Sequence, residues 1–276
     1  AEDGIRDRSP SRGLGDVYKR QNSRIMDEIL ALRQEQAALL GYESYASYAL
    51  VTRMAKTPGA VENFLVDLVT RSRSYAADEF KYLTNFVSKE APEIELEAWD
   101  IAYWSEKLRQ SQYKFSQEDV RPFFPLSRVL DGMFEIVYRL FGIAVRPALS
   151  MPQVWHKDVM FFEIFDNDGT LCGQFYLDVH ARANKRGGAW MADCISRSRK
   201  PDGGIQIPVA MLTCNFSPPI GDNPCLLAHE DVLTLFHEFG HGLHHMLTTV
   251  SEPPVAGING VPWDAVELPS QFLENW

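Results

Sequence analysis

The sequence from position 236 to 241 reads Phe-His-Glu-Phe-Gly-His, an H-E-x-x-H motif inside an apolar run over residues 231–247. Four residues advance an α-helix by about 400°, so in a helix His237 and His241 lie one turn apart on one face. Two imidazoles at this spacing can bind one zinc ion. The carboxylate of Glu238 can then reach a water molecule beside that ion. The motif therefore predicts a zinc site with Glu238 as its general base.

The alternative interpretation of this motif is a surface helix that carries two solvated histidines. The neighbouring residues argue against it, because apolar side chains flank the motif and indicate a mostly buried helix. Buried histidine and glutamate side chains need polar partners, and a metal ion supplies them. The apolar residues concerned are Leu233, Phe236, Phe239 and Leu243.

A catalytic zinc ion needs a third protein ligand and one open coordination position. The metzincin position, ten residues after the first histidine, is Leu247 here, which excludes that arrangement. Three glutamates follow: Glu252 in a proline-containing loop, Glu267 at the start of a second helical stretch, and Glu274 two turns later. A carboxylate on a facing helix completes a set of two histidines and one glutamate. Glu267 and Glu274 both suit this role, and the second could instead hold a ligand histidine in place.

Segments on both sides of the motif carry a family resemblance. They are residues 189–191 (Ala-Trp-Met), 212–216 (Leu-Thr-Cys-Asn-Phe), 237–245 and 266–276, the last beginning Val-Glu-Leu-Pro-Ser-Gln. From about residue 22 to residue 276 the chain resembles the M3 family of zinc metallopeptidases, the thimet oligopeptidase family. The resemblance implies that His237, His241 and Glu267 bind one zinc ion per chain and that Glu238 is the catalytic base. It also implies hydrolysis of short peptides inside a deep channel that excludes folded proteins.

Helical periodicity dominates the first half of the chain, and strand patterns follow it. We expect helices over residues 23–40, 44–54, 58–88, 98–114 and 126–141. Strands are expected over 159–165 and 170–177, joined by an Asn-Asp-Gly turn at 167–169. A further strand is expected over 207–215, where Pro208 indicates a sheet edge or a strand start. An exposed edge there could bind a peptide through main-chain hydrogen bonds, and a covered edge is the equal alternative. Residues 185–188, Lys-Arg-Gly-Gly, are expected to form a solvated turn.

These elements predict a mainly α-helical protein with a small β-sheet, an α+β fold with a zincin-like catalytic core in an α-helical shell. Residues 22–147 would form the helical part, and residues 148–276 the sheet and the zinc helix. Residues 1–21 show no periodicity and little to bury. Residues 16–21 also back-translate to a DNA stretch that resembles a sequencing adapter, so we expect 1–21 to be a non-native, disordered segment. The helical pattern has no stop signal at Trp276, so we expect a partial chain.

The composition is that of a globular protein, with 45% hydrophobic and 23% charged residues. No apolar run reaches the roughly 18 residues of a membrane span, and no secretory signal pattern is visible. We expect a cytoplasmic location and, separately, a monomeric state. The net charge of -10 disfavours nucleic acid and anionic membranes as partners. The cysteines match no metal or redox motif and are expected to be buried, reduced thiols: Cys172, Cys194, Cys214 and Cys225.

Two other functions stay open at this point. Peptide deformylases also contain H-E-x-x-H, but they take a cysteine ligand from a short upstream motif. Cys225 stands twelve residues before His237 and lacks the flanks of that motif. The second alternative is a catalytically incomplete fragment that only binds metal, because the family resemblance places substrate-binding histidine and tyrosine residues beyond Trp276. His244 and His245 do not replace them, and we expect both to be packed or solvated.

Overall fold

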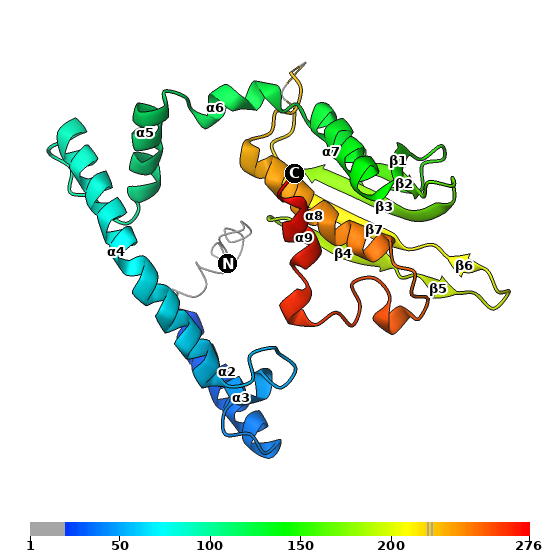
Figure 1. The fold of residues 1–276 in the computed structure, drawn as a ribbon, viewed down its shortest axis with the longest axis horizontal. Helices are drawn as coiled ribbons and strands as arrows, with labels where there is room; N and C mark the ends of the chain where they lie inside the picture. Colours follow the sequence, from blue (N-terminus) through cyan, green and yellow to red (C-terminus); the bar gives the residue numbers. More distant parts are fainter. Residues whose placement is uncertain (1–19, 220, 222) are drawn as a thin grey trace. The chain divides into compact units, whose positions relative to one another are not determined.

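The computed structural model describes residues 20–219, 221 and 223–276 (Figure 1). The chain divides into two compact units, a helical unit over Glu28–Val120 and a unit that contains Arg121–Trp276. Residues 1–19 of the expected non-native segment lie outside the described residues, and residues 20 and 21 begin the first described helix. The expectation for residues 1–21 therefore stays a prediction.

The helical unit is built around one long helix, α4 (Pro58–Glu90). Its first turn is capped by Thr57, whose hydroxyl accepts a hydrogen bond of 3.2 Å from the backbone N–H of Ala60. The expected helix over 44–54 is shorter in the structure, where it ends at Ala49 and Leu50 is its C-cap. The other helices here are α2 (Arg20–Leu39), which begins before the unit, α3 (Tyr45–Ala49), α5 (Ile101–Tyr113) and α6 (Gln117–Val120).

In its described residues from Arg121 on, the second unit combines a five-stranded mixed sheet with three α-helices, so the predicted α+β class is correct. The strand order is β1-β2-β3-β7-β4, with β3 and β7 parallel and the other neighbours antiparallel. The strands are β1 (Ala144–Pro147), β2 (Met160–Phe165), β3 (Leu171–His180), β4 (Trp190–Ile195) and β7 (Val209–Phe216), with β5 (Ser198–Arg199) and β6 (Ile205–Gln206) as a separate ribbon. The helices are α7 (Leu126–Phe141), α8 (His229–Met246) and α9 (Leu268–Leu273).

The strand that begins after Pro208 lies inside the sheet. β7 pairs with β3 on one side and with β4 on the other. Of the two alternatives predicted from Pro208, the sheet edge is therefore excluded and the strand start is correct, because β7 begins at Val209. Six of the eight residues of β7 are buried, as expected for a strand inside a sheet. The edge beside β7 belongs to β4.

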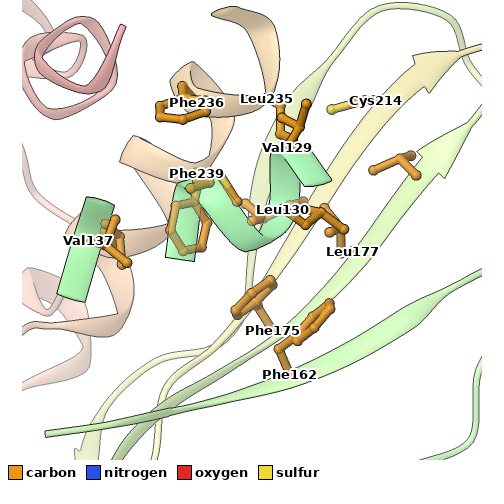
Figure 2. Packing of buried hydrophobic residues seen from close by; sticks show 14 of the residues in the cluster. Val129, Leu130, Val137, Phe162, Phe175, Leu177, Cys214, Leu235, Phe236 and Phe239 are labelled. Carbon is orange, nitrogen blue, oxygen red and sulfur yellow. The ribbon is translucent and has the colours of Figure 1, made fainter. Parts of the chain in front are cut away.

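Helices α7 and α8 lie across one face of this sheet (Figure 1). Figure 2 shows the rings of Phe239 in α8, Phe175 in β3 and Phe162 in β2 meeting in the core. The ring of Phe239 in α8 lies 5.4 Å from that of Phe175 in β3 and 6.1 Å from that of Phe134 in α7. Full burial of such a side chain stabilises a fold by about 1.5–3 kcal/mol. Phe239 is two residues, or about 200° of helix, from His237 and from His241, so its burial turns both histidines away from the sheet.

The loop after β3 is tied down by buried charges. The prediction of a solvated turn fails at Lys185, whose side chain is 6% exposed. Its ammonium donates to Asp178 Oδ1 at 2.9 Å and to the backbone oxygen of Cys214 at 2.6 Å. Burial alone would raise the pKa of Asp178, but hydrogen bonds from Arg182, Lys185 and Trp155 hold it well below its usual range. This network fastens β3 to β7 beneath the motif helix.

Two predictions drawn from composition can be compared with the structure. All four cysteines are free thiols, and Cys214 and Cys225 are buried as expected. Cys172 is half-buried, and Cys194 is exposed on the edge strand β4, so the prediction of buried thiols is wrong there. Among the described helices, none combines the length and the apolar character that a bilayer crossing requires.

Candidate metal centre

The two histidines of α8 meet Glu267, the residue directly before α9. Oε2 of Glu267 lies 3.3 Å from Nε2 of His237 and 3.1 Å from Nε2 of His241. One ligand atom from each residue lies within 4.8 Å of the others. Ligands held about 2.0–2.2 Å from a tetrahedral zinc ion are separated by about 3.3–3.6 Å, so this spacing suits zinc. Within the described part of the chain, no other three histidine, cysteine or acidic side chains form such a group.

Close packing of α9 on α8 brings Glu267 to this place. A Cβ atom added to Gly240 would lie 2.5 Å from the backbone oxygen of Pro269 and 2.6 Å from Cα of Ser270. Only glycine therefore permits this approach of the two helices. The buried Ser270 hydroxyl lies 2.8 Å from Oε2 of Glu267 and 2.9 Å from its backbone oxygen, and donates to one of them. This serine was not predicted from the sequence, although its position three residues after Glu267 places both on one helical face.

Glu274 contacts the first histidine from the opposite side of its ring. Its Oε1 lies 2.6 Å from Nδ1 of His237. A carboxylate can only accept, so Nδ1 carries the proton and the lone pair of Nε2 points toward Glu267. Glu274 thus sets the tautomer that a metal ligand needs. Burial lowers the pKa of His241, which also favours the neutral imidazole.

Glu238 lies beside these residues but is not one of them. Its side chain is buried, and the backbone N–H of Met191 in β4 stabilises its charged form. The pKa of Glu238 is raised to about 7, mainly by burial; His237 opposes this rise and the Glu267 carboxylate adds to it. Oε2 is buried and has no hydrogen-bond partner among the described residues. A buried oxygen of this kind is suited to bind a water molecule.

The remaining candidates from the sequence lie elsewhere. Glu252 is exposed and is not part of the group near the motif. Cys225 donates its thiol to the backbone oxygen of Ser217 at 3.2 Å and is also outside the group, which removes the basis for a deformylase-type site. His245 is fully buried with Nε2 2.9 Å from the backbone oxygen of Ile195, so the expectation of a packed histidine is correct for this residue.

The fold and this site define a class of protein: an α+β chain in which an H-E-x-x-H helix and a glutamate from the next helix could hold a metal ion. The profile of Peptidase family M3 matches residues 12–276, so the chain belongs to that family, as its sequence resemblance predicted.

Several relatives agree with this assignment. Oligopeptidase A of Escherichia coli (strain K12) is 52% identical over 270 residues, which cover 98% of this chain and 39% of the relative. The organellar oligopeptidase A of Arabidopsis thaliana, from chloroplasts and mitochondria, is 44% identical over 92% of this chain and 33% of its own length. Dipeptidyl carboxypeptidase of E. coli is 36% identical, covering 91% of this chain and 36% of the relative. The chain thus spans roughly two-fifths or less of the length of these relatives.

Proposed function

We propose that this chain carries the zinc centre and the catalytic base of a metallopeptidase that hydrolyses short peptides. The observation that carries the proposal is the approach of His237, His241 and Glu267 to within 4.8 Å of one another, with Glu238 beside them. Family membership supports it, since the names of the relatives denote peptidases. The chain covers 39% of the E. coli oligopeptidase A, so the activity of the whole protein is part of the proposal.

Each side chain has a separate task in this mechanism. His237, His241 and Glu267 would hold one zinc ion per chain. When bound, the ion supplies Lewis acidity toward a peptide carbonyl and a water molecule. Glu238 takes the proton of that water through its unpaired Oε2 and delivers it to the leaving amine nitrogen. Glu274 orients the His237 ring.

The edge strand β4 supports the choice of peptides as substrates. Met191 of β4 contacts Glu238, so the backbone of this strand runs beside the base. β4 pairs with β7 on one side and is the last strand of the described sheet on the other. An extended peptide can add to such an edge through main-chain hydrogen bonds, whereas the backbone of a folded domain is already paired. We therefore propose unfolded, short peptides as the substrate class. The cytoplasmic location and the monomeric state stay predictions from the sequence.

Substitution of Glu238 by glutamine tests the mechanism. Because Glu238 is a base and not a ligand, the variant should bind one zinc ion and still bind peptide. Its kcat should fall at least about a hundredfold, since a positioned proton-transfer group contributes roughly 10²–10⁴-fold. Glu135→Gln, at an exposed glutamate of α7, serves as the control and should leave kcat unchanged. Near-normal turnover of Glu238→Gln, with zinc verified in the same sample, would contradict the mechanism.

The same samples decide between this function and a metal-binding fragment without catalysis. The chain covers 39% of the E. coli relative, so this alternative is tested as well. A fragment of that kind would bind one zinc ion through the same three residues and hydrolyse no peptide faster than the buffer with zinc alone. Zinc-dependent turnover that Glu238→Gln abolishes excludes it.

A further inference from the structure

A hollow of about 400 Å³ opens beside the candidate metal centre, and we call it the acidic hollow. Its volume falls within the range of pockets that bind small groups. Three of the six lining residues are glutamates, and none of the six is a lysine or an arginine. The six are Glu230, Leu233, Thr234, His237, Glu238 and Glu274.

The carboxylate of Glu230 is available to an incoming group. Glu230, Thr234 and His237 follow one face of α8 at helical spacing. The hydroxyl of Thr234 already donates to the backbone oxygen of Glu230 at 2.9 Å, so it does not satisfy the carboxylate. Among the described residues, the Glu230 side chain has no ion-pair or hydrogen-bond partner, and it is exposed to solvent.

The second feature of the hollow is a buried carboxylate oxygen that lacks a hydrogen-bond donor. Glu238 is 6% exposed and lines the hollow, yet its Oε2 has no hydrogen-bond partner in the described structure. Leaving a buried carboxylate oxygen unpaired costs free energy, so a donor must reach it from the hollow: the water molecule that the proposed mechanism assigns to it, or an N–H group of an occupant where that water is absent. Leu233 adds an apolar wall, which suits the methylene stem of a long basic side chain.

We propose that the acidic hollow receives a cationic nitrogen group of the peptide substrate, an ammonium or a guanidinium. The group can come from a lysine or arginine side chain or from the peptide's N-terminus, because both offer N–H donors with positive charge. This inference rests on the proposed function, since the hollow adjoins the metal centre, and it adds a substrate preference that neither the motif nor the fold implies.

Matched peptides measure the preference directly. Labelled peptides that differ at one position, lysine against norleucine, are titrated into the zinc-loaded chain and followed by fluorescence anisotropy, and kcat/KM is measured in parallel. A second pair of peptides compares a free with an acetylated N-terminus. The first pair thus tests a cationic side chain, and the second pair tests the cationic N-terminus. An exposed ion pair contributes about 0.2–1 kcal/mol, so the cationic peptide should bind roughly 1.5- to 5-fold more tightly. The preference should decline in 1 M salt, where the Debye length is about 3 Å.

Two variants at exposed glutamates of the same unit locate the effect. Glu230→Gln should lower the preference toward unity, and Glu135→Gln, which removes the same charge from α7, should leave it intact. Melting curves confirm that both variants are folded. A preference that Glu230→Gln leaves unchanged, equal affinities in both peptide pairs, or no binding of any peptide would overturn the inference.

The outcome also separates this inference from the proposed function. A cationic preference that depends on Glu230, found without any hydrolysis, supports the hollow and contradicts the peptidase. Hydrolysis without a charge preference supports the peptidase and overturns the assignment of the hollow.

Discussion

Replacing Gly240 by alanine should weaken zinc binding without touching a ligand. The new Cβ would lie 2.5 Å from the backbone oxygen of Pro269, and ordinary contact begins at 3.4 Å, so α9 must retreat by about 0.9 Å. Glu267 precedes α9 directly and moves with it. Metal sites tolerate deviations of only about 0.2 Å in ligand distance. Loss of a residue that hydrogen-bonds to a metal ligand and orients it typically lowers metal affinity by about 10–100-fold. We expect the displacement of Glu267 to lower zinc affinity by a similar factor.

The same substitution should have a modest effect on folding. Overpacking of this kind costs about 1–3 kcal/mol, and the better helix propensity of alanine offsets about 1 kcal/mol of that. We therefore expect a net loss of up to about 2 kcal/mol in the free energy of unfolding. Urea unfolding of the metal-free protein measures this loss, and competition with a chromophoric chelator measures zinc affinity.

Gly132 of α7 is the matched control. A Cβ there meets no atom within 4 Å, so Gly132→Ala should stabilise the protein by up to about 1 kcal/mol and leave zinc affinity unchanged. If Gly240→Ala binds zinc as tightly as the parent and gains stability like the control, then the close approach of the two helices does not position Glu267.

Three further predictions concern residues around the centre. Glu274→Gln should weaken zinc binding by about 10–100-fold while one ion still binds, because the histidine loses its orienting carboxylate; chelator competition measures this. The low pKa of Asp178 means that its contribution to stability is present above about pH 4 and is lost as pH falls further. The free energy of unfolding of Asp178→Asn should therefore be about 3–5 kcal/mol lower than that of the parent at pH 7. Urea unfolding at pH 7 and pH 3 should also show a smaller loss of stability on acidification in the variant than in the parent. Burial raises the pKa of the Cys214 thiol to about 12, so a thiol reagent at pH 8 should label the exposed Cys194 and leave Cys214 unmodified until unfolding.

Each of these has a result that would contradict it. Complete loss of metal in Glu274→Gln but not in Glu267→Gln would exchange the roles of the two glutamates. An Asp178→Asn variant as stable as the parent at pH 7 would mean that the buried ion pairs contribute nothing net. Labelling of Cys214 in the folded protein, detected by peptide mapping, would show that the sheet opens beneath α8.

Local signals predicted the elements that position the site. The apolar spacing and Gly142 placed α7 at Leu126–Phe141, and the left-handed φ of 73° at that glycine explains why the helix ends there. The Asn-Asp-Gly turn likewise predicted the hairpin of β2 and β3, with Gly169 at a φ of 84°. The spacing of His237 and His241 is also local, because the geometry of one helix turn dictates it.

Long-range pairing was beyond the reach of these signals. Nothing near Pro208 distinguishes an edge strand from an interior one, since the position of β7 depends on β3 and β4, which are distant in sequence. The burial of Lys185 depends in the same way on Asp178 and Cys214. The contact of Met191 with Glu238 could likewise be found only once the place of β4 in the sheet was known, because no periodic pattern in the sequence indicates it.

The place of β7 between β3 and β4 has a consequence for the order of assembly. β4 precedes β7 in the chain but reaches the sheet only through it, so β3 and β4 cannot join until β7 has been synthesised and inserted between them. Parallel pairing over a long connection is a slow step in folding, and unpaired strands are prone to aggregate until it is complete. The motif helix α8 follows β7 directly in the chain and packs on it. The surface that supports the two histidines is therefore among the last parts of the sheet to form, and a ribosome releases it only just ahead of the helix that needs it.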